Sequence, residues 1–296
     1  MRLSTSTNIA NFDLRKPYEQ MMESAIGICA AAGYRYLDAN LCGLSRPGKT
    51  VCPMTLDNWE ESARSWKKLA DSIGVEFLQG HAWFSVEGPV QKGCVPGGEF
   101  GEEMMRRSVL AAEILGIHNL VVHPVTVLDG DRMDKEETYR FNLEYYTRWG
   151  KVFGEHGLTM AIENMSCPKG AVYPSIWADM DTLCRLADEI GLKNVGVCLD
   201  TGHAFMSGLK PEDCVRAIGK RLKATHIADN HGEKDDHVSP YMGEINWTEV
   251  VHALKEIGYE EDFSFETHHL TSCFPKQIQP DLIRFSHTLG EYLVNL

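Results

Sequence analysis

The sequence predicts a single α/β domain, built as a closed (β/α)8 barrel in which a helix follows each of eight parallel strands. Three observations favour this TIM-barrel fold class. Short apolar runs alternate with amphipathic stretches along the whole chain, and a glycine ends most of those stretches immediately before the next apolar run. Eight such units fit within the 296 residues of the chain, which is an ordinary length for this fold.

The expected strands are short segments rich in Val, Ile, Leu, Phe and Tyr, as strands are when both faces of a parallel sheet are buried. Most follow directly on a glycine such as Gly33, Gly74 or Gly116, because glycine adopts the left-handed backbone that ends a helix. In chain order we expect strands at residues 3–8, 34–40, 75–81, 117–124, 158–164, 192–200, 222–228 and 259–267.

Amphipathic stretches between the strands predict the helices. Residues 56–71, 99–115 and 134–155 place apolar side chains near helical spacing, so each would pack one face on the barrel. A doubly wound open sheet is the alternative, but it usually has fewer strands and often a glycine-rich phosphate turn. Neither GxGxxG nor GxxxxGK[ST] occurs in the sequence. Without a linker or a low-complexity segment, residues 1–296 are expected to form one domain.

Composition excludes several classes of protein. With 43% hydrophobic and 24% charged residues, the chain is not disordered, collagenous or a small disulfide scaffold. No apolar run is long enough to span a bilayer, and the first ten residues contain no secretory apolar region, so we expect a cytoplasmic protein with no membrane partner. The 9 cysteines form no CxxC pair and are expected to be reduced. The net charge of −13 disfavours a nucleic acid bound through its phosphates.

Potential metal ligands stand at the ends of six consecutive expected strands. Taken singly, a histidine there is more often a hydrogen-bonded structural residue, and a carboxylate more often caps the next helix. Since the carboxyl ends of barrel strands meet at one mouth, however, this many charged groups would repel one another without a cation. The sequence therefore predicts a metal site made from His81, His123, Glu163, Asp200, His226 and Glu266.

Several segments resemble the xylose-isomerase-like TIM-barrel superfamily, in matching order over most of the chain. This superfamily contains sugar and sugar-phosphate isomerases and epimerases, inosose dehydratases and apurinic endonucleases. The segments are AIEN (161–164), LDTGHAF (199–205), HIADNHGEKDDH (226–237), MGEINW (242–247) and FSFET (263–267).

The resemblance implies one divalent cation held by Glu163, Asp200, His226 and Glu266. This set is rich in oxygen and lacks sulfur, which favours manganese first, with magnesium, cobalt or zinc as alternatives. In the epimerases that the sequence resembles, the two glutamates also flank the substrate carbon. The implied activity is isomerisation or epimerisation of a keto sugar, a sugar phosphate or a related polyol, by proton transfer between Glu163 and Glu266 through a metal-stabilised enediolate.

Five further residues keep a rival activity open. Together with the four implied ligands, they match all nine metal-ligand positions of the three-metal apurinic endonucleases, which cleave phosphodiesters. We favour contacts with substrate hydroxyls instead, because the chain is acidic and because Trp83 and Phe84, in the loop after His81, could stack on a sugar. These substrate-binding or second-metal candidates are His81, His123, His203, Asp235 and His237, with Trp83 added as a substrate contact.

Two more readings stay open. Subunits of C-glycoside-cleaving lyases, which act on 3-keto glycosides with a small partner chain, share this barrel and metal site. A sugar-binding barrel without catalysis is the non-enzymatic alternative, and the presence of both glutamates argues against it.

A homo-oligomer is also expected from the family. The long loop at residues 41–53 is a candidate lid, in which Arg46 and Lys49 could meet a phosphate.

Overall fold

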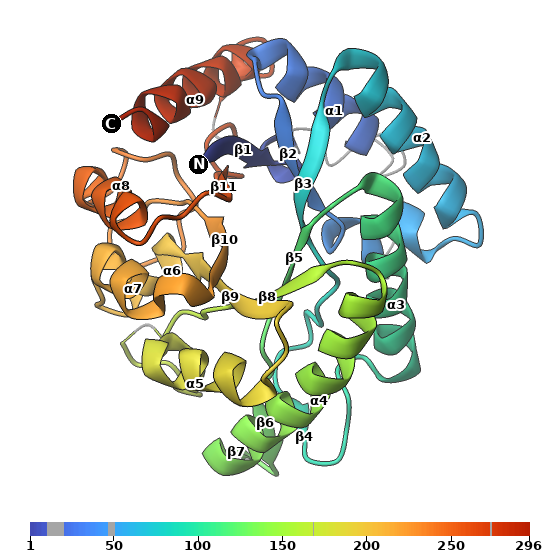
Figure 1. Cartoon of the computed structure of the whole chain (residues 1–296), viewed down its shortest axis with the longest axis vertical. Coiled ribbons are helices and arrows are strands. Elements are labelled where there is room, and N and C mark those ends of the chain that lie inside the picture. Colours follow the sequence, from blue (N-terminus) through green and yellow to red (C-terminus); the bar gives the residue numbers. More distant parts are fainter. Residues whose placement is uncertain (11–20, 47–50, 168, 273) are drawn as a thin grey trace.

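A computed structural model describes residues 1–10, 21–46, 51–167, 169–272 and 274–296. The predicted (β/α)8 barrel is confirmed: eight parallel strands form one sheet in the order β10-β9-β8-β5-β3-β2-β1-β11, with helices around it (Figure 1). The eight barrel strands are β1 (Arg2–Ser6), β2 (Tyr36–Asn40), β3 (Glu76–His81), β5 (Asn119–Val122), β8 (Thr159–Glu163), β9 (Val195–Asp200), β10 (Leu222–His226) and β11 (Asp262–Phe265).

The barrel closes between β10 and β11, the first and last strands in the order of the sheet. A single parallel bridge joins Ile227 to Phe265, just beyond the carboxyl end of β10. Around it the Ile227 amide donates to the Ser264 carbonyl over 2.7 Å, and the Glu266 amide donates to the Ile227 carbonyl over 3.0 Å. The closure therefore fixes the two strand ends that carry His226 and Glu266.

Nine helices are found among the described residues, most of them on the outside of the barrel (Figure 1). On α2, Trp59, Ala63, Trp66 and Ala70 are buried, which is the apolar face that the sequence predicts. The helices are α1 (Met21–Ala32), α2 (Trp59–Ile73), α3 (Gly98–Leu115), α4 (Lys135–Glu155), α5 (Met180–Ile190), α6 (Thr201–Met206), α7 (Pro211–Ile218), α8 (Trp247–Glu256) and α9 (Gln279–Val294).

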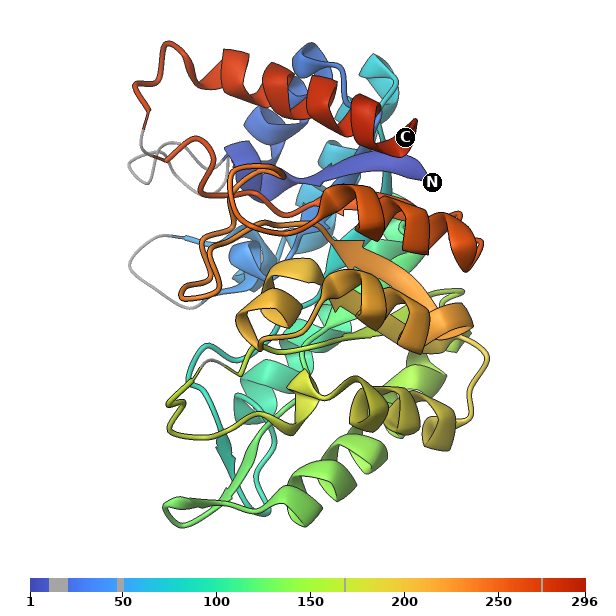
Figure 2. The ribbon, with the colours of Figure 1, turned by 90° about the vertical axis from the view of Figure 1, so that its left-hand side faces the viewer.

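Glycine shapes the packing of the last helix on the first strand. A Cβ at Gly290 of α9 would lie 2.3 Å from the Leu3 side chain of β1, so only glycine allows this close approach. The C-terminal helix thereby lies over β1, which pairs with β11 in the sheet (Figure 2).

A small second sheet, absent from the sequence prediction, lies in the loops after β3 and β5. It consists of β4 (Val90–Gln91), β6 (Val127–Asp129) and β7 (Arg132–Met133), and its strands are only two or three residues long. Strands this short give no periodic signal in the sequence. Their position matters, because Val90 of β4 lines the cavity at the barrel mouth. No helix of the described residues is both long and apolar enough to cross a bilayer.

Candidate metal centre

The six strand-end side chains converge on one cavity of about 1000 Å³ at the mouth of the barrel. His81, Glu163, Asp200 and His226 are the last residues of their strands, whereas His123 and Glu266 follow their strands by one residue. His81, His123, Glu163 and Glu266 line the cavity, and Asp200 and His226 are fully buried beside them.

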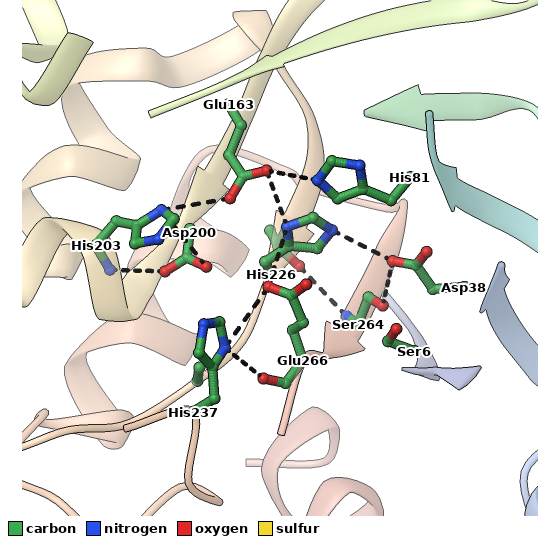
Figure 3. Close-up of polar contacts among 12 residues, drawn as sticks. Ser6, Asp38, His81, Glu163, Asp200, His203, His226, His237, Ser264 and Glu266 are labelled. Atoms are coloured by element: carbon green, nitrogen blue, oxygen red, sulfur yellow. Dashed lines mark hydrogen bonds and ion pairs between the residues drawn. The ribbon is translucent and has the colours of Figure 1, made fainter. Parts of the chain in front are cut away.

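Four of these residues form the central group drawn in Figure 3. One ligand atom from each of Glu163, Asp200, His226 and Glu266 lies within 4.8 Å of all the others. The His226 Nδ1 atom is 3.3 Å from a Glu163 oxygen and 3.5 Å from a Glu266 oxygen, and the two glutamates approach the ring from opposite sides (Figure 3). Glu163 Oε2, Asp200 Oδ2 and His226 Nδ1 are buried without a hydrogen-bond partner.

These unpartnered atoms fit a divalent cation. A buried polar atom without a partner costs free energy comparable to a lost hydrogen bond, and three carboxylates this close together repel one another. A cation among them would satisfy all three unpartnered atoms and offset the repulsion. Oxygen and imidazole donors without sulfur are what manganese, magnesium and cobalt prefer, and zinc also accepts them.

Asp200 caps a helix and also faces the cavity. One of its oxygens accepts a hydrogen bond from the His203 amide over 2.7 Å at the start of α6, which leaves the other free for a ligand. Asn164 holds the Asp200 backbone from the neighbouring strand through two hydrogen bonds of 2.7 and 3.0 Å. Capping and ligation therefore do not exclude each other at this position.

His81 and His123 form a second group with Glu163. Their Nε2 atoms lie 2.9 Å apart, and both approach Glu163 Oε2, at 3.4 and 3.2 Å. A proton shared between the rings or a cation next to them would stabilise so close an approach. His81 is oriented by a contact of 2.9 Å between its Nδ1 atom and the Ala82 carbonyl.

The loop after β10 supplies a third group. Asp235 Oδ2 lies 3.3 Å from His203 Nε2 and 2.9 Å from His237 Nε2, and its other oxygen is buried without a partner. His237 has a left-handed backbone (φ 43°), which is costly for a residue other than glycine and typical of functional loops. The fold thus brings together all nine residues that match the metal-ligand positions of the three-metal apurinic endonucleases in the sequence analysis.

Asp229 organises this loop, and the sequence did not single it out. Its side chain accepts hydrogen bonds from Trp247 Nε1 over 2.8 Å, from the Asn230 amide over 2.9 Å and from the Ile245 amide over 3.2 Å. It is fully buried, so both ends of the excursion that carries Asp235 and His237 are tied to one carboxylate.

Electrostatics keep the site charged. Burial alone raises the pKa of Glu163, but the imidazoles of His226 and His123 outweigh it and hold that pKa well below its usual range. Burial lowers the pKa of His237, yet Asp235 and Glu266 outweigh it and raise the pKa to about 9. Asp200 differs, because burial dominates and raises its pKa to about 6. A cation must therefore compete with protons for the imidazoles.

Asp38 of β2 is a second residue that sequence reasoning missed. Its Oδ2 atom lies 3.4 Å from His226 Nε2, on the side of the ring opposite the metal-facing Nδ1 (Figure 3). The same oxygen accepts hydrogen bonds from Gln79 over 2.7 Å and from Ser264 over 3.1 Å. The signal of this role is the burial of the carboxylate, which is only 1% exposed inside the barrel. The sequence does not reveal that burial, because a single acid within a strand can face either the interior or the solvent.

The aromatic residues after β3 divide their roles. Trp83 lines the cavity but is only 5% exposed, since its ring is packed against Gly97 and Gly101 of the α3 region. Phe84 is the half-buried ring that faces the histidines, and it stacks on His123 at 4.1 Å between centroids. Arg46 lies over Phe84 at 5.9 Å, whereas Lys49 falls outside the described residues.

Solved structures with the same fold include a D-tagatose 3-epimerase-like protein and an IolI protein with a bound zinc atom. The first is 21% identical with a TM-score of 0.75, over 100% of this chain and 98% of the other. The second is 17% identical with a TM-score of 0.71, over 100% and 98% of the two chains. At these identities the likeness concerns the fold.

Curated relatives give local sequence matches. A probable endonuclease 4 of Mycobacterium tuberculosis is 28% identical over 165 residues, which are 53% of this chain and 60% of that protein. The inosose isomerase of Bacillus subtilis is 25% identical over 158 residues, 51% of this chain and 54% of the other. The matches thus span only about half to three fifths of those relatives.

A family model, described as xylose isomerase-like TIM barrel, matches residues 26–288. This range contains all nine residues of the three groups and seven of the eight barrel strands. The protein belongs to the xylose isomerase-like TIM barrel family.

Proposed function

We propose that the protein is a divalent-metal-dependent isomerase or epimerase of a keto sugar, a sugar phosphate or a related polyol. The observation that carries the proposal is the placement of Glu163 and Glu266 on opposite sides of His226, with unpartnered ligand atoms between them in a cavity (Figure 3). The proteins to which this chain is similar support an activity of this class, since they include a D-tagatose 3-epimerase-like protein and an inosose isomerase.

Glu163, Asp200, His226 and Glu266 would hold the cation. A divalent cation here supplies Lewis-acid stabilisation of the negative charge that develops on substrate oxygens, and manganese is our first choice. Asp200 and His226 are buried and fixed by Asn164 and Asp38, so they suit a holding role. Glu163 and Glu266 line the cavity and can also reach a substrate.

The two glutamates are suited to move a proton. One carboxylate takes the proton next to the substrate carbonyl on one face, and the other, carrying a proton, delivers it on the opposite face or to the adjacent carbon. The imidazoles of His226 and His123 hold the pKa of Glu163 well below its usual range, so Glu163 is deprotonated but a weak base. A cation bound to the substrate carbonyl would make the neighbouring C–H acidic enough for such a base. The surrounding polar groups of His81, His203 and His237 would bind the substrate hydroxyls and fix its position.

Deuterium exchange tests this proposal. We would incubate a panel of ketoses, ketose phosphates and inososes with protein and Mn²⁺ in heavy water and follow each carbon by nuclear magnetic resonance. We expect uptake of deuterium next to the carbonyl of at least one compound and loss of that uptake after chelation. Absence of uptake across the panel, with the metal shown to be bound, contradicts the proposal.

A second candidate activity is phosphodiester cleavage by a three-metal centre, as in the endonuclease relatives. The observation in its favour is that His203, Asp235 and His237 form a further group with ligand atoms within 4.8 Å, beside the group of His81, Glu163 and His226. Counting metals per chain after native purification separates the two candidates. One metal and no nicking of an abasic duplex favour the sugar enzyme, whereas three metals with nicking favour the phosphodiesterase.

A further inference from the structure

A second chamber of about 490 Å³ opens beside the candidate metal cavity. Its walls come from the segment between β3 and the start of α3, with Arg46 at the border. Trp83, Phe84, Val86 and Val90 line both volumes, so the two lie side by side. We call the second volume the outer chamber.

The outer chamber is mostly apolar. Its lining contains the rings of Trp83, Phe84 and Phe100 and the side chains of Val86, Pro89, Val90 and Val95. Val86 is 59% exposed, Val95 39% and Phe100 38%, although apolar side chains of this size usually gain free energy by burial. A group that covered them would recover that free energy.

The position of Trp83 is built into the chain. A Cβ at Gly97 would lie 2.7 Å from the Trp83 ring, and one at Gly101 would lie 2.5 Å from it. Phe100 packs edge-on against the same ring, at 6.3 Å between centroids. The wall of the outer chamber is therefore preformed, as small-molecule sites usually are.

Phe84 connects the outer chamber with the chemistry. One face of its ring stacks on His123, whose Nε2 atom is 3.2 Å from Glu163. A molecule with one end between Glu163 and Glu266 would reach Phe84, which also lines the outer chamber. Among the described residues that line the chamber, Arg46 is the one cation and Glu87 the one acid, so charge does not favour a phosphate there.

Size points the same way. Pockets of roughly 300–1,000 Å³ bury most of a drug-sized molecule, and the metal cavity alone is at the upper end of that range. A free monosaccharide needs only part of the metal cavity and none of the outer chamber.

We propose that the outer chamber is a second subsite, which takes an apolar ring joined to the keto sugar, so that the substrate is a keto sugar that carries an aromatic or similarly apolar substituent. This inference builds on the proposed sugar function. It assigns Phe84, Val86 and Val95 to the recognition of the substituent and leaves the reacting end at Glu163 and Glu266.

Binding of two probes tests the proposal without catalysis. We would measure the Kd of phenyl β-D-glucoside and of methyl β-D-glucoside for the metal-loaded protein by calorimetry. The phenyl probe should bind at least tenfold more tightly. Val95→Asp and Phe100→Asp each place a charge in the outer chamber at a residue that does not line the metal cavity. Each should reduce that preference at least fivefold without changing metal content or methyl glucoside binding.

Two controls make the result decisive. Ile73→Asp alters a comparably exposed aliphatic residue, 44% exposed at the end of α2, and should leave the preference unchanged. Glu163→Gln should abolish deuterium exchange but keep the preference, which separates failure of the subsite from failure of the proposed reaction. Equal affinity for the two probes, no binding of either, or a preference that survives both Val95→Asp and Phe100→Asp overturns the proposal.

Discussion

Asp38→Asn should weaken metal binding while leaving the fold intact. In the structure the Asp38 carboxylate faces His226 Nε2 at 3.4 Å, and Nδ1 of the same ring faces Glu163 and Glu266. A carboxylate behind a ligating imidazole fixes the ring orientation and makes the ring a stronger donor to the metal. An asparagine oxygen can still accept hydrogen bonds from Gln79 and Ser264, so the substitution removes mainly the charge.

The size of the effect follows from the contact. Hydrogen bonds to charged groups contribute about 1.5–3 kcal/mol and neutral ones about 0.5–1.5 kcal/mol, so loss of the charge costs roughly 1–1.5 kcal/mol. A distance of 3.4 Å is longer than an ideal N–H···O contact, which places the effect toward the lower end. We expect Mn²⁺ to bind about fivefold more weakly, just below the roughly 10–100-fold range for such substitutions.

Competition with a fluorescent chelator measures this affinity without reference to activity. Asp262→Asn is the matched control, because Asp262 is also a buried carboxylate of the barrel sheet but pairs with Arg2 over 2.8 Å. It should leave the Mn²⁺ affinity unchanged. If Asp38→Asn binds Mn²⁺ as tightly as the unaltered protein, or if both variants lose affinity equally, the reasoning about His226 is refuted.

Three further predictions concern stability and protonation. Chelation of the metal should lower Tm by roughly 4 °C, because a cation at 100 times its Kd contributes about 2.7 kcal/mol to the folded state of a chain of 296 residues. Calorimetry with and without chelator checks this, and an unchanged Tm contradicts a bound cation. Burial raises the pKa of Asp262 to about 7 from 3.8, so the folded protein holds that proton more tightly and its stability falls as pH rises from about 4 to 7. The Asp262→Asn variant should not lose stability in this way. Its free energy of unfolding, measured by urea titration, should therefore rise relative to that of the unaltered protein by up to roughly 4 kcal/mol between pH 4 and 7. A difference that stays constant with pH contradicts the assignment. In metal-free protein, Asp235→Asn should lower the pKa of His237 from about 9, as followed by its ring proton resonances, since Asp235 is 2.9 Å from the ring; an unchanged titration would show that Asp235 does not hold the proton there.

The fold could be predicted because its signals are local and repeated. Glycine after each helix and an apolar run after each glycine place most barrel strands within a few residues of the structure, as with Thr159–Glu163 against the expected 158–164. The first strand ends earlier than expected, at Ser6, because residues Thr7–Ala10 form a 3-10 helix. The strands of the second sheet are too short to produce a pattern.

The site was predictable to the extent that it lies at strand ends. Topology alone sends Glu163, Asp200 and His226 to one mouth, so their chemistry could be inferred before their distances were known. Asp38 and Asp229 could not be found this way, because their roles depend on contacts with residues more than a dozen positions away. The difference in exposure between Trp83 and Phe84 likewise could not be predicted, because it depends on close packing of Trp83 against Gly97 and Gly101.

The most direct test of the central claim is the fate of the substrate proton in Glu163→Gln and Glu266→Gln, each loaded with Mn²⁺ to the same content. With a substrate found in the deuterium panel, we predict that neither variant forms the isomer or epimer. We also predict that Glu266→Gln still exchanges the substrate proton with heavy water, because Glu163 remains to take that proton on one face. Glu155→Gln, at an exposed position on α4, should behave like the unaltered protein. Product formation at the normal rate by either metal-loaded glutamate variant of the site would contradict proton transfer between Glu163 and Glu266.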